Sequence, residues 1–356
     1  MRTTITTLLG CEHPVIQAPM AGGGDTPALV AATGNAGGFG FLGAAYLAPA
    51  QIADAVRAVR ALSARPFGIN LFAPTALDAG ADVEAARARL APYYAEFGLP
   101  VPAAAPPEDR FDAQLDAALA ANVRAISFTF GIPTAAALEK VRAGNAVLIG
   151  TATTVAEAHA LRDAGFDAIV AQGSEAGGHR GTFLAPFEDA MIGTVALVPQ
   201  VIDAARLPVI ASGGIMDGRG VAAALALGAG AVQLGTAFLT CAEAGIVEEY
   251  KNLILRTTED GTRLTRAFSG RPARGIANRM LLELADAAAQ IAPFPLQNAL
   301  TRPLRSAAAQ RGCTDFLSLW CGQAPRLAQR QPAADLVRRL VAETRAAIGA
   351  LGAALD

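Results

Sequence analysis

Lysine and histidine are both scarce in this sequence of 356 residues, and each shortage narrows the chemistry available to the chain. The two lysines, Lys140 and Lys251, fall outside the predicted strands, whereas a Schiff-base aldolase needs a desolvated lysine on a strand. The sequence also contains no P-loop and no GxSxG motif. With three histidines in the chain, His13, His159 and His179, few residues can act as an acid–base group near neutral pH.

An excess of charge of either sign is lacking as well. Charged residues make up 17% of the chain and the net charge is −2, so nothing indicates binding to nucleic acid or to an anionic membrane. The cysteines are scattered without a CxxC motif, and the N-terminal residues show neither an apolar core nor a cleavage signal. We therefore expect a cytoplasmic protein with reduced thiols. These thiols are Cys11, Cys241, Cys313 and Cys321.

The longest uncharged run, 220–242, is long enough to raise the question of a membrane span. Gly228, Gly230 and Gly235 interrupt this run, and Gln233 lies in its middle. Such interruptions favour a buried helix, a turn and a buried strand over a span.

What the sequence does contain is a series of short apolar runs that alternate with helical patterns. Strands are predicted at 15–22, 39–43, 67–72, 125–130, 146–151, 168–172, 209–213 and 231–236. Helices are predicted at 27–35, 50–61, 82–97, 111–121, 155–164, 193–205 and 220–227, and a further helix follows Pro133 and ends near 143. This alternation indicates a parallel sheet, and eight strands favour a closed TIM (β/α)8 barrel over an open doubly wound sheet. Hydrophobic residues make up 53% of the chain, enough for a large core.

The predicted barrel occupies 1–245, and 246–356 is expected to be a mainly helical cap that covers the barrel mouth and completes the barrel with its last helices. No further strand pattern is visible after 245. Helical runs are predicted at 281–290 and 333–350, with joints at Pro293, Pro295 and Pro303. The Pro-rich stretch 99–109 is expected to be a loop insertion.

The stretch 168–181, AIVAQGSEAGGHRG, predicts a buried strand followed by a Gly-rich loop that carries His179. Active sites of barrels lie at the carboxyl ends of the strands, so His179 is the candidate catalytic base or orienting group. Two alternatives stay open: an exposed histidine without a role, and a metal pair with Glu175, which the intervening glycines and the missing third ligand disfavour. Arg180 is either an anion contact or a solvated residue.

Two other strand ends are rich in glycine, 211–215 (ASGGI) and 233–236 (QLGT). Backbone N–H groups exposed by glycine, followed by a helix, bind phosphate well, and barrels commonly place a phosphate after strands seven and eight. The competing explanation is that these glycines serve only tight turns and close helix packing. The remaining strand ends carry small or amide side chains, which suit a flat ligand with polar edges.

Together, these motifs resemble the nitronate monooxygenase family, formerly called 2-nitropropane dioxygenases. The resemblance spans nearly the whole chain and departs from many relatives at Thr129, where they carry histidine, which affects the expected shape of the substrate pocket. The matching strings are APMAGG (18–23), GGFGFLG (37–43), GINLF (68–72), SFTFGIP (127–133), GTATT (150–154), QGSEAGGHRG (172–181), PVIASGGI (208–215), QLGTAFL (233–239), PLQNALTRPLR (295–305) and DFLSLWCGQ (315–323).

The resemblance implies an FMN-dependent barrel enzyme that oxidises alkyl nitronates with O2 to carbonyl compounds and nitrite, as a monomer or homodimer. His179 would hold the nitronate or remove a proton from a neutral nitroalkane. Two alternatives remain: an NAD(P)H-dependent flavin reductase for quinones or enoyl thioesters on the same scaffold, and a barrel enzyme for a phosphate ligand without flavin. The implied FMN contacts are Met20, Asn70, Gln172, Gly177, Gly178, Ser212, Gly213, Gly214, Gln233, Leu234, Gly235 and Thr236.

Overall fold

Eight parallel strands close into a barrel in the computed structural model, which describes residues 1–75, 82–103 and 108–355. The closed barrel predicted from the sequence is therefore confirmed. The strands, in spatial order, are β1 (Val15–Gln17), β2 (Phe39–Gly43), β3 (Gly68–Phe72), β4 (Ala125–Thr129), β5 (Val147–Ala152), β6 (Ala168–Gln172), β8 (Val209–Ser212) and β9 (Ala231–Leu234), and β9 pairs with β1.

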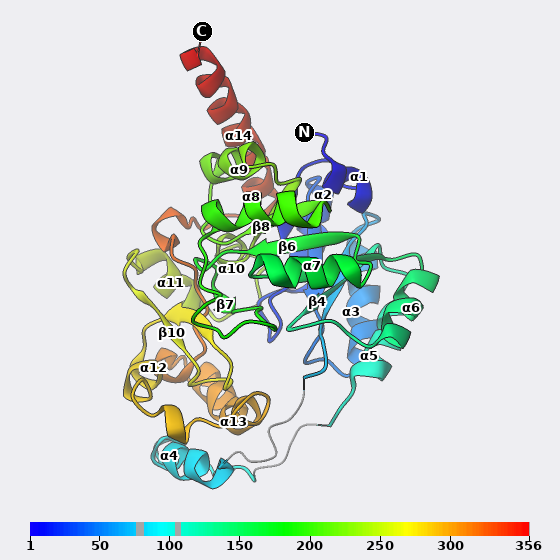
Figure 1. The fold of residues 1–356 in the computed structure, drawn as a ribbon. Helices are drawn as coiled ribbons and strands as arrows, with labels where there is room; N and C mark the ends of the chain where they lie inside the picture. Colours follow the sequence, from blue (N-terminus) through cyan, green and yellow to red (C-terminus); the bar gives the residue numbers. More distant parts are fainter. Residues whose placement is uncertain (76–81, 104–107, 356) are drawn as a thin grey trace.

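Helices surround this barrel and bury their apolar faces against the strands (Figure 1). Several begin at a side-chain cap, as with Thr26, Thr134, Thr154 and Asp217, each of which accepts a hydrogen bond from a backbone N–H of the first turn. The helices are α2 (Pro27–Asn35), α3 (Pro49–Leu62), α5 (Phe111–Ala120), α6 (Ala135–Ala143), α7 (Val155–Asp163), α8 (Thr194–Ala205), α9 (Gly218–Ala226) and the short α10 (Thr236–Leu239). An unpredicted helix, α1 (Thr4–Leu9), packs Ile5 and Leu9 against the residues inside the barrel.

The uncharged run 220–242 is a helix, a turn and a strand, as predicted. It contains most of α9, then Gly228 in a left-handed conformation (φ 97°), then β9 and α10. No helix among the described residues is long and apolar enough to cross a membrane.

A second hydrophobic core lies beside the barrel mouth, and we call the part of the chain around it the cap (Figure 1). It is built by α4 (Val83–Glu96), α11 (Glu248–Arg256), α12 (Arg279–Glu283) and α13 (Leu296–Gln310). The placement of α4 differs from the sequence expectation of a barrel helix, because its buried Tyr93 and Tyr94 pack with residues beyond 245. Conversely, α14 (Ala333–Leu355) packs against α9 and α2 in the barrel core. The boundary expected at 245 therefore does not separate the two cores.

Two expectations for the C-terminal part are wrong in detail. The helix predicted at 281–290 ends as α12 at Glu283, and Ala288–Gln290 forms only a 3-10 turn. Pro303, expected at a joint, lies inside α13. A proline loses one backbone hydrogen bond inside a helix, and the packing of Leu300 and Leu304 in the second core stabilises α13 around it.

The prediction of no strands beyond 245 is also wrong. The antiparallel strands β10 (Thr262–Thr265) and β11 (Ala273–Ile276) form a small sheet with β7 (Gly178–His179). Strand β7 lies in the loop 173–181 after β6, which we call the histidine loop. Sequence patterns missed these strands because they are four residues long and carry arginines rather than alternating apolar residues. The sheet fastens the histidine loop to the cap, since Ala273 pairs with His179.

Candidate active site

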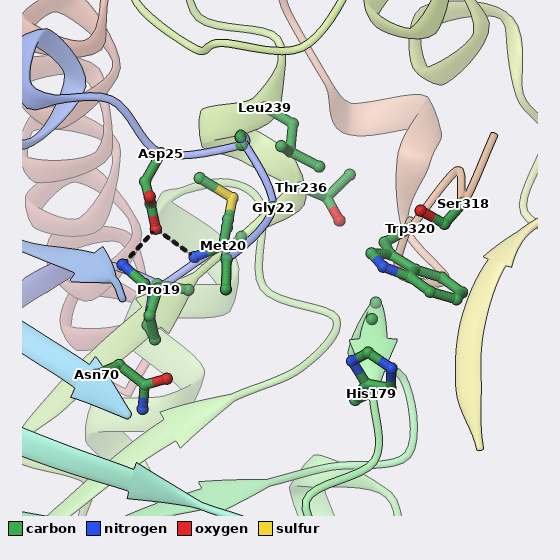
Figure 2. A pocket seen from close by; sticks show the side chains of 18 of the residues that line it. Pro19, Met20, Gly22, Asp25, Asn70, His179, Thr236, Leu239, Ser318 and Trp320 are labelled. Atoms are coloured by element: carbon green, nitrogen blue, oxygen red, sulfur yellow. Dashed lines mark hydrogen bonds between the residues drawn. The ribbon is translucent and has the colours of Figure 1, made fainter. Parts of the chain in front are cut away.

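A cavity of about 730 Å³ lies at the carboxyl ends of the barrel strands, between the barrel and the cap. Every residue that the sequence predicted for the site lines this cavity: Met20, Asn70, Gln172, Gly177, Gly178, His179, Ser212, Gly213, Gly214, Gln233, Leu234, Gly235 and Thr236. We call these residues, without Gly177, Gly178 and His179 but together with Thr129, the barrel wall. Figure 2 shows Met20 and Asn70 on one side of the cavity and His179 with Trp320 on the other.

The glycines after β8 and β9 leave backbone N–H groups unused. Gly213 and Gly214 follow β8 with left-handed backbones (φ 118° and 70°), which side chains rarely adopt. Among the described residues, the N–H groups of Gly213, Gly214 and Gly235 have no hydrogen-bond acceptor, in contrast to that of Gly173, which donates to Ser212 O at 2.8 Å. Because β8 and β9 are neighbours in the barrel, these donors lie on one edge of the cavity, where a phosphate group would satisfy them.

Two amides of the barrel wall, Asn70 and Gln172, differ in how many of their polar atoms already have partners. Asn70 Nδ2 donates to Ser127 Oγ (2.9 Å) and Thr129 Oγ1 (3.2 Å), which leaves its carbonyl oxygen for a ligand. Thr129, the position that departs from the family, therefore orients Asn70. By contrast, Gln172 donates to His179 O (3.0 Å) and accepts from the Gly181 N–H (2.8 Å). Its polar atoms hold the histidine loop, so the predicted flavin contact of Gln172 stays a prediction.

A half-buried carboxylate supports the loop that carries Met20. Asp25 Oδ2 accepts the backbone N–H groups of Met20 (2.6 Å) and Gly43 (2.8 Å), as the dashed lines in Figure 2 show. The bonds tie the end of β1 to the end of β2. Burial raises the pKa of Asp25 to about 6, although the two backbone hydrogen bonds oppose that shift. The sequence analysis missed Asp25 as a site residue.

His179 is the titratable group that faces this cavity from the loop after β6. Its Nε2 lies 2.8 Å from Ser269 Oγ, whereas its Nδ1 bonds to no described residue and is not buried. Burial of the ring, followed by the positive charges of Arg271 and Arg305, lowers the pKa of His179 to about 3. The imidazole is therefore neutral at physiological pH.

Aromatic rings surround His179 and fix its plane. Its centroid lies 5.3 Å from Trp320, 5.6 Å from Phe130 and 6.5 Å from Phe72. Phe130 has a left-handed backbone (φ 78°), a strained conformation for a bulky residue that the Arg271 guanidinium helps to hold, 3.9 Å above the ring. Strained residues cluster at functional sites, which agrees with the position of Phe130 in the cavity wall.

Buried charged groups fasten the histidine loop to the barrel. Glu157 is fully buried and accepts hydrogen bonds from Thr153 Oγ1 (2.6 Å), Thr182 Oγ1 (2.8 Å) and the Phe183 N–H (2.5 Å). Of the two roles considered for Arg180, the solvated residue is wrong, and the anion contact stays a prediction. Its side chain is buried and donates to the carbonyl oxygens of Gln172 and Ala190.

The side of the cavity opposite the barrel wall comes from the cap and was missed by sequence reasoning. We call Ser269, Asn298, Arg302, Arg305, Ser318 and Trp320 the cap wall. Burial lowers the pKa of Arg305 to about 10, so it stays charged at neutral pH; it donates to Asn298 Oδ1 at 2.6 Å. The strings 295–305 and 315–323 signalled this region only through the resemblance, which assigned no role to their residues.

The comparisons with known proteins agree over nearly the full length. The family model described as "Nitronate monooxygenase" matches residues 2–343. A protein named probable nitronate monooxygenase, from Staphylococcus aureus (strain Newman), is 44% identical over 343 residues, which cover 96% of each chain.

Two solved structures are similar to this chain over nearly its full length. The nitroalkane oxidase from Streptomyces ansochromogenes superposes with a TM-score of 0.92 at 42% sequence identity, over 98% of this chain and 99% of that chain. FabK from Thermotoga maritima is more distant, with a TM-score of 0.80 at 27% identity over 99% of each chain.

Proposed function

The chain belongs to the nitronate monooxygenase family, a family of flavoenzymes, and we propose that it oxidises alkyl nitronates with O2 to carbonyl compounds and nitrite, with FMN as its cofactor. The barrel wall offers what FMN requires. Unused N–H groups of Gly213, Gly214 and Gly235 suit a phosphate, and the free carbonyl oxygen of Asn70 suits a flavin edge. Bound FMN would supply the redox chemistry, and the protein would bind and orient the substrate.

The observation that supports an anionic substrate is the charge around His179. Arg305 lies in the cavity wall, and Arg271 stacks on the cavity-lining Phe130. The hydrogen bonds of these guanidinium groups go to neutral partners, including Thr182 O and Asn298 Oδ1. A cavity with two half-buried cations at its edge attracts an anion such as a nitronate.

We expect the purified enzyme to release nitrite from ethyl nitronate in air without a nicotinamide cofactor. Rapid NADH oxidation with a quinone or enoyl thioester, and no nitrite, would assign the chain to the alternative NAD(P)H-dependent flavin reductases. A colourless protein that binds no flavin would favour the second alternative, a barrel enzyme for a phosphate ligand.

His179→Asn should keep FMN and lose roughly 10- to 100-fold in kcat/KM for the nitronate, since a hydrogen bond to a charged group contributes about 1.5–3 kcal/mol. His159→Asn is the matched control, because His159 is part of α7 and does not line the cavity. An unchanged rate for His179→Asn, measured by nitrite release, would remove this histidine from the mechanism.

We also propose that the enzyme acts in the cytoplasm, as a monomer or homodimer, with the nitronate and O2 as its partners. A sedimentation measurement distinguishes the two oligomeric states. We further propose that the residues beyond 245 act as a functional unit, because they supply the cap wall.

A further inference from the structure

The side chain of Thr236 lies between the Gly-rich edge of the cavity and the cap. Thr236 directly follows Gly235 after β9, is 8% exposed and lines the cavity (Figure 2). Its Oγ1 accepts the backbone N–H of Gly322 at 3.0 Å, a contact between residues 86 apart in the sequence. Gly322 directly follows Cys321, which is part of the second hydrophobic core. The hydroxyl of Thr236 therefore joins the end of a barrel strand to the cap.

Thr236 keeps its hydroxyl proton available. A threonine hydroxyl provides one donor and two acceptor positions, and the Gly322 N–H occupies one of the acceptor positions. Among the described residues, Oγ1 donates to no oxygen or nitrogen atom. Burial raises the pKa of the neighbouring Cys321 to about 12, so its sulfur belongs to a neutral thiol, which is a weak acceptor. A buried hydroxyl that lines a cavity without a strong acceptor points to a ligand there.

The ligand that fits beside this hydroxyl is a phosphate group. The adjacent N–H group of Gly235, like those of Gly213 and Gly214, has no acceptor among the described residues. Ser212 Oγ donates to Gln233 O at 3.1 Å, which ties the end of β8 to β9 and keeps these donors together. Phosphate oxygens are charged acceptors, and hydrogen bonds to charged acceptors are roughly twice as strong as neutral ones.

Residues 320–323, which we call the Trp320 segment, pack close to the same edge. A Cβ atom on Gly177 would lie 2.5 Å from Gly322 N, so the segment touches the histidine loop directly. A Cβ atom on Gly213 would lie 3.2 Å from Ala176 N, so the same loop also borders the unused N–H groups. The Gly-rich edge and the Trp320 segment are thus neighbours across the histidine loop.

The Trp320 segment also carries part of the wall around His179. The centroid of the indole ring lies 5.3 Å from that of His179. Within the segment, the N–H of Gln323 donates to a backbone carbonyl at 3.0 Å, whereas the N–H of Gly322 donates to the side-chain hydroxyl of Thr236. A ligand that strengthens this hydroxyl as an acceptor therefore steadies the segment that carries the indole.

We propose that Thr236 is a positioning residue that couples the phosphate site to the cap. A bound phosphate accepts the hydroxyl proton of Thr236, and the hydroxyl becomes a stronger acceptor for the Gly322 N–H, because hydrogen bonds in a chain polarise one another. Binding of the phosphate then steadies the Trp320 segment and the indole next to His179. This coupling rests on the phosphate site of the proposed function and is independent of the substrate that the enzyme oxidises.

One backbone amide reports the coupling directly. Cys321–Gly322 is the only position in the sequence where glycine follows cysteine, so labelling the full chain with 13C′-cysteine and 15N-glycine isolates the Gly322 amide signal. Its hydrogen exchange rate is measured in the protein loaded with FMN and in the protein loaded with riboflavin, which lacks the phosphate. We expect exchange to be roughly 5-fold slower with FMN, a factor typical of coupled sites. Equal rates with the two flavins overturn the proposal.

Thr236→Val removes the hydroxyl at nearly constant volume and tests the cause. We expect the difference in exchange between FMN and riboflavin to disappear in this variant. The Kd of FMN should rise roughly 10- to 100-fold with an unchanged Kd of riboflavin, because a hydrogen bond to a charged group is lost. Thr236→Ser keeps the hydroxyl and should keep both properties. An FMN effect on exchange that persists in Thr236→Val assigns the coupling to another group and contradicts the role of Thr236.

Thr240→Val is the matched control. Thr240 follows α10, is fully buried and donates to Gln329 O at 2.9 Å, but it does not line the cavity. We expect this variant to keep the difference in exchange between the two flavins. The comparison of the wild type with Thr236→Ser decides the proposal even if Thr236→Val does not fold, since both retain the hydroxyl and both must respond to the flavin phosphate.

Nitrite release from ethyl nitronate, measured on the same samples, separates this proposal from the proposed function. If the wild type releases no nitrite but FMN slows the exchange of Gly322, nitronate oxidation is wrong and the coupling stands. If nitrite is released and the exchange rate ignores the flavin phosphate, the reverse holds. If the protein binds no flavin, saturating inorganic phosphate replaces FMN in the test: slower exchange supports the coupling, and an unchanged rate overturns it.

Discussion

The barrel wall of the cavity presents small groups, amides and backbone N–H groups on the ends of regular strands. The cap wall presents two hydroxyls, one amide, an indole and two guanidinium groups on turns and one helix. The first surface suits a flat cofactor with a phosphate. The second surrounds His179 with charge and bulk. His179 itself connects them, since it follows the barrel strand β6 and pairs through β7 with the cap strand β11. We therefore propose that the two walls divide the work, with the barrel wall binding the cofactor and the cap wall recognising the substrate.

The largest effect is expected where the histidine loop is anchored to the barrel. Glu157→Ala removes the acceptor of several donors, among them Thr182 Oγ1 and the Phe183 N–H. It also removes the carboxylate whose negative charge acts on Arg180 and Arg271. We expect a loss of about 3–5 kcal/mol in the free energy of unfolding, measured by urea denaturation.

Glu139→Ala, at an exposed position of α6, should stay within about 0.5 kcal/mol of the wild type. If Glu157→Ala loses as little free energy of unfolding as Glu139→Ala, the histidine loop is held by its pairing with β11 rather than by the barrel. The position of His179 then depends on the cap.

A smaller effect on stability, which depends on pH, is expected at Asp25, which supports the loop that carries Met20. Burial raises the pKa of Asp25 from 3.8 to about 6, so the folded protein binds this proton more tightly than the unfolded chain. The corresponding stabilisation is fully present below about pH 4 and is lost as the pH rises through about 6, for a total of about 1–3 kcal/mol.

Asp25→Asn keeps an oxygen that can accept from the N–H groups of Met20 and Gly43 but does not ionise. We therefore expect the wild type to lose stability relative to this variant between about pH 4 and 6.5, measured as the difference in Tm. Asp203→Asn, at an exposed position of α8, should show no such trend. Parallel pH profiles for Asp25→Asn and the wild type would mean that the Met20 loop does not depend on a titrating group.

The comparison of the walls also explains which parts of the site could be predicted. The barrel wall follows from local patterns, because apolar runs give the strands and parallel strands bring their carboxyl ends together; Gly213, Gly214 and His179 were found in this way. Ser269 and Arg305 were missed because long-range packing places them. Ser269 lies 90 residues from His179 in sequence, on a turn between two strands too short and polar to be recognised.

The same reason explains the placement of α4. Its helical pattern was correct, but the pattern does not reveal which core the helix joins. Tyr94 donates from its hydroxyl to Leu300 O at 2.5 Å, a contact 206 residues away in the sequence. Such contacts are visible only in the folded chain.

The smallest effects are expected in the cap wall, and two arginines one turn apart on α13 separate the effect of a half-buried charge from that of an exposed charge. Arg305→Met removes the half-buried cation next to the cavity and should raise the KM for ethyl nitronate roughly 10-fold, or about 1.4 kcal/mol, while FMN binding stays unchanged. Arg302→Met removes an exposed cation at the same cavity, over the ring of Tyr46.

Because exposed charges are screened within about 8 Å at physiological salt, Arg302→Met should change kcat/KM by only about 2-fold at low salt and not at all at high salt. Steady-state kinetics at two salt concentrations check both variants. If the two variants behave alike, or if Arg305→Met weakens FMN binding as much as nitronate binding, then the cap wall does not act separately on the substrate, and the division of labour between the two walls is wrong.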